Sequence, residues 1–281
     1  MIYITGDIHR NPIRFSSRFF PEGKDMTKDD YVIVCGDFGL IWDYEGESSE
    51  ENYWLNWLDN KPWTTLFVPG NHENYDRLYG IDDPALLKCW LYDNLTESQK
   101  DNLYAGYPEK GWHDGMVREL RPSVLMLERG YIFNLCGKKF FSFGGASSHD
   151  IADGILHPEY LASKAEMNKI YKQWNEENKM FRVSHTTWWR QEMPTEEEMC
   201  RGIKTLEDND WMVDFVVTHC APSSTLALLS HGCYKPDKLN SYLEEIRQKL
   251  KYTKWFFGHY HDNKNVTQND LCIYEQIIRI V

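Results

Sequence analysis

Five short apolar runs in this chain each end in a glycine, an acid, an amide or a histidine. Runs this short, rich in β-branched and aromatic residues, predict buried strands. Open α/β sheets collect their ligands at the C-terminal ends of the strands, so we expect the terminal residues to meet there. The five runs, each with its polar block, are Ile2–Thr5 before Gly6-Asp7-Ile8-His9, Tyr31–Cys35 before Gly36-Asp37, Thr65–Pro69 before Gly70-Asn71-His72-Glu73, Val213–Thr218 before His219, and Trp255–Phe257 before Gly258-His259-Tyr260-His261.

The residue types at these strand ends indicate metal binding. Aspartate, histidine and asparagine together form a ligand set suited to first-row divalent ions. The five blocks carry enough of them for two ions. The competing interpretation is turn chemistry, because Gly-Asp and Gly-Asn are ordinary sequences after a strand. Any one block alone favours turn chemistry, whereas the whole set favours a metal site.

Length, charge and cysteine pattern limit the class of protein. With 281 residues the chain can bury a large core as one domain with insertions, or as two packed lobes. A formal charge of −12 disfavours a long nucleic-acid backbone as partner without excluding nucleic acid. Seven scattered cysteines without a CxxC pair fit a reducing compartment. No apolar run approaches a membrane span, and a first strand at Ile2 leaves no room for a signal peptide. We therefore expect a cytoplasmic protein with no membrane partner.

The chain is expected to be α/β and to form a single domain over residues 1–281, with insertions at about 74–120 and 155–208. Residues 1–73 indicate a βαβαβ start, with an amphipathic helix over 49–60. Thr195 and the glutamates after it have the capping-box form, which predicts a helix over 196–208. The other expected elements are a hairpin within 125–143 with its turn at Cys136-Gly137-Lys138, helical stretches over 158–179 and 239–250, and a closing strand over 271–281. Residues 74–120 are expected to form loops and short helices along one wall of a pocket.

The five blocks, in this order, resemble the calcineurin-like metallophosphoesterases. The resemblance spans nearly the whole chain. It implies a four-layer α/β/β/α sandwich with the site at the loops that join strands to helices. It also implies a hydrolase that acts on phosphoesters with two divalent ions, for which Mn²⁺ is expected and Fe²⁺ or Zn²⁺ would also fit.

The resemblance assigns ligands to each ion. Asp7, His9, Asp37 and His261 would hold the first, and Asp37, Asn71, His219 and His259 the second. Asp37 would therefore bridge two ions about 3.5–4 Å apart, where an anionic bridge offsets their repulsion. The neutral imidazoles and the amide keep the ligand charge low, so that the ions can lower the pKa of a shared water.

His72 directly follows the ligand Asn71. In the family such a histidine lies over the metals without binding them, and it protonates the leaving oxygen or stabilises the transition state. The chain departs from the protein-phosphatase branch, because the residues after Gly36-Asp37 lack that branch's phosphate-clamping arginine and the aspartate that orients the histidine.

Arg10 and His149 are candidate substrate-binding residues. Arg10 stands where the family often has glycine, and its guanidinium could bind phosphate through two hydrogen bonds. A solvated arginine explains it equally well. His149 follows Gly144-Gly145, whose lack of side chains would permit close backbone approach to the site. The alternative is a turn with a satisfied histidine. The tryptophans and tyrosines of residues 75–112 and Trp188-Trp189 could stack an aromatic leaving group, but packing is the interpretation that we favour.

The leading hypothesis is a dinuclear phosphoesterase with a small phosphorylated substrate, a phosphodiester or a nucleotide-type ester. A hydroxide shared by the two ions would attack phosphorus, with no phosphoenzyme. The alternatives are a phosphomonoesterase or protein phosphatase, a catalytically silent scaffold, and a nuclease. The sequence leaves the oligomeric state open.

Overall fold

The computed structural model describes residues 1–81, 83 and 86–281, and two sheets make up its centre. The seven-stranded sheet has the order β15-β1-β2-β3-β6-β5-β4, and the six-stranded sheet has the order β13-β14-β12-β11-β8-β7. The first contains β1 (Ile2–Thr5), β2 (Tyr31–Val34), β3 (Thr64–Phe67), β4 (Glu109–Trp112), β5 (Gly115–Arg121), β6 (Val124–Leu127) and β15 (Ile278–Arg279). The second contains β7 (Tyr131–Leu135), β8 (Lys138–Phe143), β11 (Phe215–Thr218), β12 (Lys254–Phe257), β13 (Lys264–Asn265) and β14 (Asp270–Cys272).

The central strands of each sheet are parallel. β1, β2, β3 and β6 run the same way in the first sheet, as do β8, β11, β12 and β14 in the second. β1, β2, β3 and β11 are buried at every position, which is why the sequence shows them as continuous apolar runs rather than alternating ones. The carboxyl ends of these strands therefore share one edge in each sheet.

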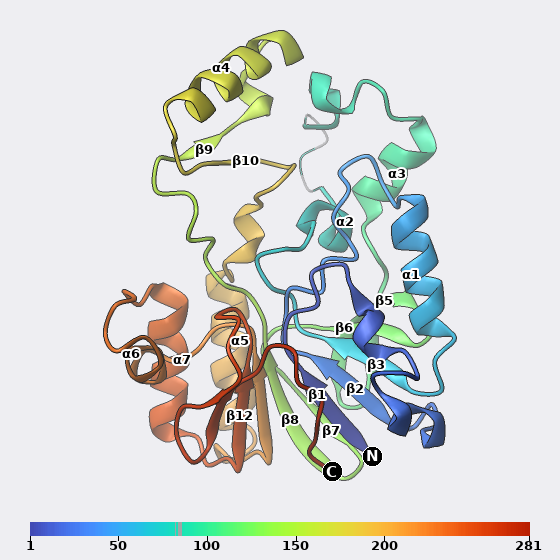
Figure 1. The fold of residues 1–281 in the computed structure, drawn as a ribbon, viewed down its shortest axis with the longest axis vertical. Coiled ribbons are helices and arrows are strands. Elements are labelled where there is room, and N and C mark those ends of the chain that lie inside the picture. The colour runs from blue at the N-terminus through green and yellow to red at the C-terminus, as the bar shows by residue number, and fades with distance from the viewer. Residues whose placement is uncertain (82, 84–85) are drawn as a thin grey trace.

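Three apolar clusters hold the layers together. One joins residues of both sheets, among them Ile4 and Ile33 of the first and Val217 and Phe256 of the second. A second joins the first sheet to helix α1 (Ser49–Asp59). A third joins the second sheet to α5 (Glu196–Glu207), α6 (Ser223–Ser230) and α7 (Lys238–Lys249). Each cluster fills one of the three interfaces that a layer order of helix, sheet, sheet and helix would contain. Figure 1 shows α1 and the pair α6–α7 on opposite sides of the strands.

The mixed α/β class with two sheets agrees with the expected fold, and several local predictions are confirmed. α1 forms within the predicted range 49–60, and α5 starts at the predicted capping box of Thr195 with Glu198. A second capping box, of Ser48 with Glu51, starts α1 and was not predicted. The hairpin of β7 and β8 forms as predicted. The remaining helices are α2 (Tyr75–Tyr79), α3 (Glu97–Ala105) and α4 (Lys164–Glu176).

Three local expectations are wrong. Between β1 and β2 the described residues form two 3₁₀ turns, Pro12–Phe15 and Pro21–Asp25, instead of an α-helix. The later part of 74–120 is not loop, because β4 and β5 extend the first sheet as an antiparallel ladder. The end of the chain forms two short strands instead of one, and they belong to different sheets: β14 pairs with β12, and β15 pairs with β1. In the last two cases backbone pairing partners decided the outcome, and the local sequence does not reveal them.

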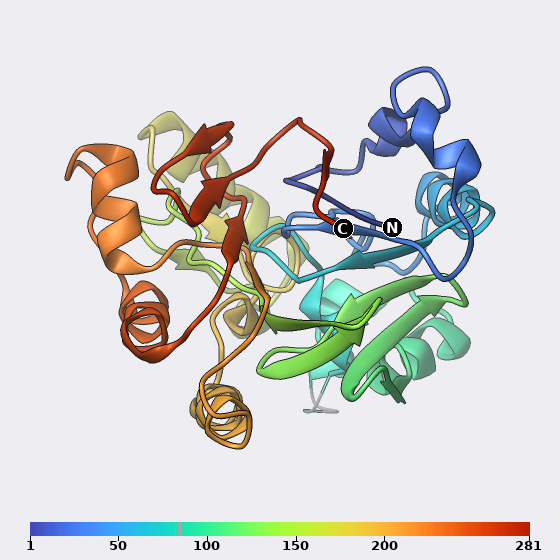
Figure 2. The ribbon, with the colours of Figure 1, turned by 90° about the horizontal axis from the view of Figure 1, so that it is seen from below.

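The division into one domain with two insertions stays a prediction. In Figure 1 the small sheet of β9 (Ile155–Leu156) and β10 (Arg182–Val183), together with α4, projects beyond the rest of the molecule. α5 lies in the same predicted insertion, yet Met199 and Leu206 of this helix pack into the core on the second sheet. The two ends of the chain lie next to each other in Figure 2, since β15 pairs with β1. Within the described ranges, no helix has both the length and the apolar character to cross a bilayer.

The core between the sheets should carry much of the stability. Leu66 of β3 is fully buried there, so Leu66→Ala should lower the free energy of unfolding by about 2–5 kcal/mol. Leu228 on α6 is 56% exposed, and Leu228→Ala should change it by less than about 0.5 kcal/mol. Urea denaturation in the presence of a chelator measures both values. Equal losses for the two variants would contradict this account of the core.

Candidate metal centre

All seven predicted metal ligands lie at the carboxyl ends of five strands. Asp7 and His9 follow β1, Asp37 follows β2, and Asn71 follows β3 of the first sheet. His219 follows β11, and His259 and His261 follow β12 of the second sheet. The two halves of the set therefore come from two different sheets, and they meet where the edges of these sheets adjoin.

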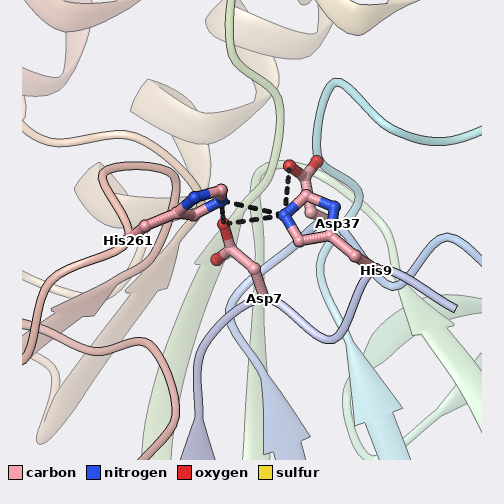
Figure 3. Close-up of side chains that lie close together, drawn as sticks. All are labelled: Asp7, His9, Asp37 and His261. Atoms are coloured by element: carbon pink, nitrogen blue, oxygen red, sulfur yellow. Dashed lines mark hydrogen bonds and ion pairs between the residues drawn. The ribbon is translucent and has the colours of Figure 1, made fainter. Parts of the chain in front are cut away.

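The side chains form two groups that share Asp37. Ligand atoms of Asp7, His9, Asp37 and His261 lie within 4.8 Å of one another, and Figure 3 shows these side chains facing a common point. Ligand atoms of Asp37, His219 and His259 form a second group within the same distance. The Asn71 Oδ1 atom joins the second group at 3.3 Å from His219 Nε2. These groups have the composition that the resemblance implied, while the role of each residue as a ligand stays a prediction.

The close approach of ring nitrogens fits a site for cations. His9 Nε2 lies 2.8 Å from His261 Nε2, and His261 Nε2 lies 3.2 Å from Asp7 Oδ2. Three electron-pair donors converge there, which suits a divalent ion that accepts imidazole and carboxylate ligands. Taken together, the donors of the two groups fit two divalent ions.

The site has a buried floor and an open rim. Asp7, Asp37, Asn71 and His219 are at most 2% exposed. The side chains of His9 and His261 are 31% and 48% exposed. A ligand can thus reach the rim from solvent, while the floor is enclosed by its surroundings.

Hydrogen bonds set the direction of the floor residues. His219 Nδ1 lies 2.7 Å from the carbonyl oxygen of Cys35, which leaves Nε2 to face Asp37. The backbone N–H of His259 donates to Asp7 Oδ1 at 3.0 Å, and that of His72 donates to Asp37 Oδ1 at 2.9 Å. Each carboxylate is therefore oriented by a backbone group from a different block.

Glycines make room for these contacts. A β-carbon on Gly36 would overlap the ring of His219, and one on Gly258 would overlap the carboxylate of Asp7. Gly36 also has a φ of +93°, a conformation that other residues rarely adopt. The glycines that precede the polar residues are thus required by close approach.

The backbone around the site is strained. Four non-glycine residues of the blocks have left-handed φ angles, namely His9, Asp37, His259 and His261, and so does Arg10 directly after the first block. Such conformations cost of order 1–3 kcal/mol each and cluster at functional sites. Buried Glu73 supports one of these turns, because its carboxylate accepts hydrogen bonds from the backbone N–H groups of Phe38 and Gly39 at 2.7 and 3.1 Å. Burial, together with the charge of Asp37, raises the pKa of Glu73 to about 8.

The electrostatics of the floor favour positive charge. Burial alone would raise the pKa of Asp37, but the neighbouring His219, His72 and His9 rings lower it. Burial opposes protonation of His219, yet Asp37 outweighs burial and raises the pKa of His219 to about 9. A buried carboxylate that attracts a proton onto its neighbour is also one that attracts a metal ion.

A family comparison agrees with this geometry. The family model described as calcineurin-like phosphoesterase matches residues 1–263. The chain belongs to the calcineurin-like phosphoesterases. A search of curated proteins found no match. Membership makes the protein a metal-dependent hydrolase of phosphoesters, and the two His/Asp groups are its possible metal site.

In this phosphoesterase His72 lies beside the metal groups. Its ring centroid is 5.0 Å from that of His9, and it stacks on Trp42 at 5.5 Å. Burial lowers the pKa of His72 to about 4; the guanidinium of Arg182 adds to this effect, against the pull of Asp37. The catalytic role of His72 stays a prediction.

Arg10 and His149 occupy different surroundings. The Arg10 NH1 and NH2 groups lie 3.3 and 3.1 Å from the two carboxylate oxygens of Asp43, so this guanidinium already has an anionic partner. His149 is exposed and its ring is 6.2 Å from that of His259. Gly145 donates its N–H to the carbonyl of Pro69 at 2.7 Å, which is the close approach that the glycine pair was expected to allow. The substrate-binding roles of Arg10 and His149 stay predictions.

One residue beside His72 escaped the sequence analysis. Arg182 NH2 lies 3.3 Å from His72 Nε2, although Arg182 belongs to the second predicted insertion. Trp189 of the same segment packs edge-on against Trp42 at 5.5 Å and is buried in the core, as the favoured interpretation of this residue expected. Arg182 stands in no motif, so no sequence signal could have placed it beside His72.

Asp37 should be the residue on which both ions depend. Asp37→Asn keeps the shape but removes the charge shared by the two groups, so Mn²⁺ loading should leave at most one ion per chain, or two that bind at least about 10-fold more weakly. Elemental analysis and calorimetry measure the loss. The control is Asp262→Asn, since Asp262 is exposed and follows His261 directly; it should retain both ions. Unchanged binding in Asp37→Asn would refute the shared role.

Proposed function

We propose that this phosphoesterase hydrolyses a phosphodiester or a nucleotide-type phosphoester. The supporting observation is a cavity of about 560 Å³ that adjoins the metal groups through His259 and His261. Tyr234, Lys235 and Tyr260 also line it, and the rings of Tyr234 and Tyr260 stack at 6.2 Å. A cavity of this size can hold an organic substituent beyond the phosphate itself. The aromatic and cationic lining suits the base and the charge of a nucleotide-type substrate.

The chain's residues would divide the work of hydrolysis. Two divalent ions held by the seven ligands would supply a nucleophile at neutral pH and neutralise charge on the phosphate oxygens. Asp37 would fix both halves of the site, and the exposed rim at His9 and His261 would admit the substrate. The ring of His72 is neutral near pH 7 in the free protein, because its pKa is lowered to about 4. It can donate one N–H to the leaving oxygen, and it becomes a stronger donor once it is protonated beside an anion.

The remaining parts of the proposal rest on the sequence. We expect a small phosphorylated substrate in preference to nucleic acid, because the net charge is −12. We propose Mn²⁺ as the bound metal, and Fe²⁺ or Zn²⁺ would satisfy the same ligand types. A cytoplasmic location is proposed from the seven scattered cysteines, all of which are free in the structure.

A direct comparison of two chromogenic substrates tests the substrate class. With Mn²⁺ loaded, kcat/KM should be higher for bis-p-nitrophenyl phosphate than for p-nitrophenyl phosphate, because the cavity accommodates a second ester group. A clear preference for the monoester would replace the diesterase proposal with a phosphomonoesterase. No turnover of either substrate, or of nucleotide esters, would favour the catalytically silent scaffold.

His72 should be needed for turnover but not for metal binding. His72→Ala should lower kcat by about 10²–10⁴-fold, the usual effect of losing a general acid, while Mn²⁺ content stays unchanged. The assay needs a poor leaving group such as an alkyl phosphate ester, since a good leaving group would hide the loss. His231→Ala, at an exposed histidine after α6, should keep wild-type kcat. Loss of metal in His72→Ala would mean that His72 is a ligand.

A further inference from the structure

The guanidinium of Arg182 is placed beside the metal centre by a segment outside the five blocks. Arg182 is 8% exposed and lies on β10, in the segment 155–208 that was predicted as an insertion. Its NH2 group lies 3.3 Å from His72 Nε2. His72 in turn contacts the ring of His9, one of the predicted ligands. One side chain therefore separates Arg182 from the group of side chains around Asp7.

Arg182 is fixed in place by its own partners. Its Nε atom pairs with Asp150 Oδ1 at 2.6 Å, and its NH1 group donates to the carbonyl oxygen of Thr187 at 3.3 Å. Thr187 belongs to the turn after β10, where its hydroxyl accepts the N–H of Val183 at 2.9 Å. Asp150 lies in the loop that starts at Gly144 and leads to β9. Two separate segments thus orient the guanidinium.

The loop that carries Asp150 is itself anchored. Ser148 donates both its backbone N–H and its hydroxyl to the buried carboxylate of Glu192, each at 2.7 Å. Glu192 lies in the same segment as Arg182. The hydrogen bonds between Ser148 and Glu192 therefore already connect this segment to the loop of Asp150, and the ion pair of Arg182 with Asp150 adds to that connection. A guanidinium held this way loses little further freedom when it binds a ligand.

Arg182 has donor capacity that its protein partners do not use. A guanidinium carries five N–H donors. Within the described part of the chain, three contacts of Arg182 are resolved: to Asp150, to Thr187 and to His72. His72 is a poor permanent partner, because its own proposed task is to donate to the same substrate group. A bound phosphoryl group would accept from both side chains at once, its leaving oxygen from His72 and a non-bridging oxygen from Arg182.

The other arginines close to the centre are engaged elsewhere. Arg10 pairs with Asp43 and lies 3.6 Å from Glu50. Arg14 donates to the backbone carbonyls of Asp7 and Tyr274 and to the hydroxyl of Thr5. Both therefore support the protein's own structure, and Arg182 faces His72 instead.

We propose that Arg182 binds a non-bridging phosphoryl oxygen of the substrate, held in position by Asp150. The segment 155–208 would thereby supply the phosphate-binding guanidinium that is missing from the sequence after Asp37. This inference rests on the proposed phosphoesterase activity, and it applies to a diester or a monoester, since both carry non-bridging oxygens. It assigns the segment 155–208 a part in substrate binding.

Inorganic phosphate is the probe that tests Arg182 apart from turnover. Calorimetry on the Mn²⁺-loaded protein should give a dissociation constant for phosphate that rises about 10- to 100-fold in Arg182→Ala, the range for a lost hydrogen bond to a charged group. Arg182→Lys should also be weakened, because a point charge cannot replace the planar fork. Asp150→Asn should give a smaller increase. Metal content and the unfolding temperature should match the wild type in Arg182→Lys.

The matched control is Arg190→Ala. Arg190 is exposed and lies in the same segment, so its replacement removes the same charge without touching the centre and should leave phosphate binding unchanged. Wild-type phosphate affinity in Arg182→Ala, or equal losses in Arg182→Ala and Arg190→Ala, would overturn the inference. In either case, hydrolysis by the wild type would leave the proposed function intact. A wild-type protein that neither binds phosphate nor hydrolyses any ester would overturn both.

Discussion

The packing of the two sheets against each other is the interaction on which the metal centre depends. Four of the predicted ligands follow strands of one sheet and three follow strands of the other, so neither sheet could form the centre alone. The cluster that includes Ile4, Ile33, Val217 and Phe256 aligns the two edges. Burial of each such side chain contributes about 1.5–3 kcal/mol. The contact of His219 with the Cys35 carbonyl and that of the His259 N–H with Asp7 then fix the alignment at the site itself.

The buried floor of the site carries an excess of acidic groups that the protein's own positive charges do not fully balance. Asp7, Asp37 and Glu73 are all buried within one small region. Backbone N–H groups hydrogen-bond each of these carboxylates, but hydrogen bonds do not cancel charge. The raised pKa of Glu73 and the raised pKa of His219 are two local responses to this excess. Divalent ions are the ligands that would neutralise it, which links the strained backbone of the blocks to their function.

The segment 155–208 shapes the surroundings of His72 from two directions. Arg182 meets the ring at its Nε2 atom, and Trp189 packs on the Trp42 ring that stacks on His72. Trp189 is itself fixed by a hydrogen bond from Nε1 to Asp76 Oδ2 at 2.9 Å. Differences between members of a family that share metal ligands can arise from such added segments, because function is set by the site more than by the fold.

Local features of this protein could be predicted from the amino-acid sequence. The apolar runs located β1, β2, β3, β11 and β12, helical spacing located α1, and the capping box at Thr195 located the start of α5, because these signals depend on neighbouring residues only. The ordered blocks identified the family and gave the predicted set of ligands, because polar residues at strand ends keep their spacing within each block. Only the tertiary structure determined which strands β4, β5 and β15 pair with. It also determined which residues from outside the blocks surround His72. Strand pairing and the contact of Arg182 with His72 join residues that are far apart in the chain, and such contacts are selected by packing and charge in the folded state, which no local pattern encodes.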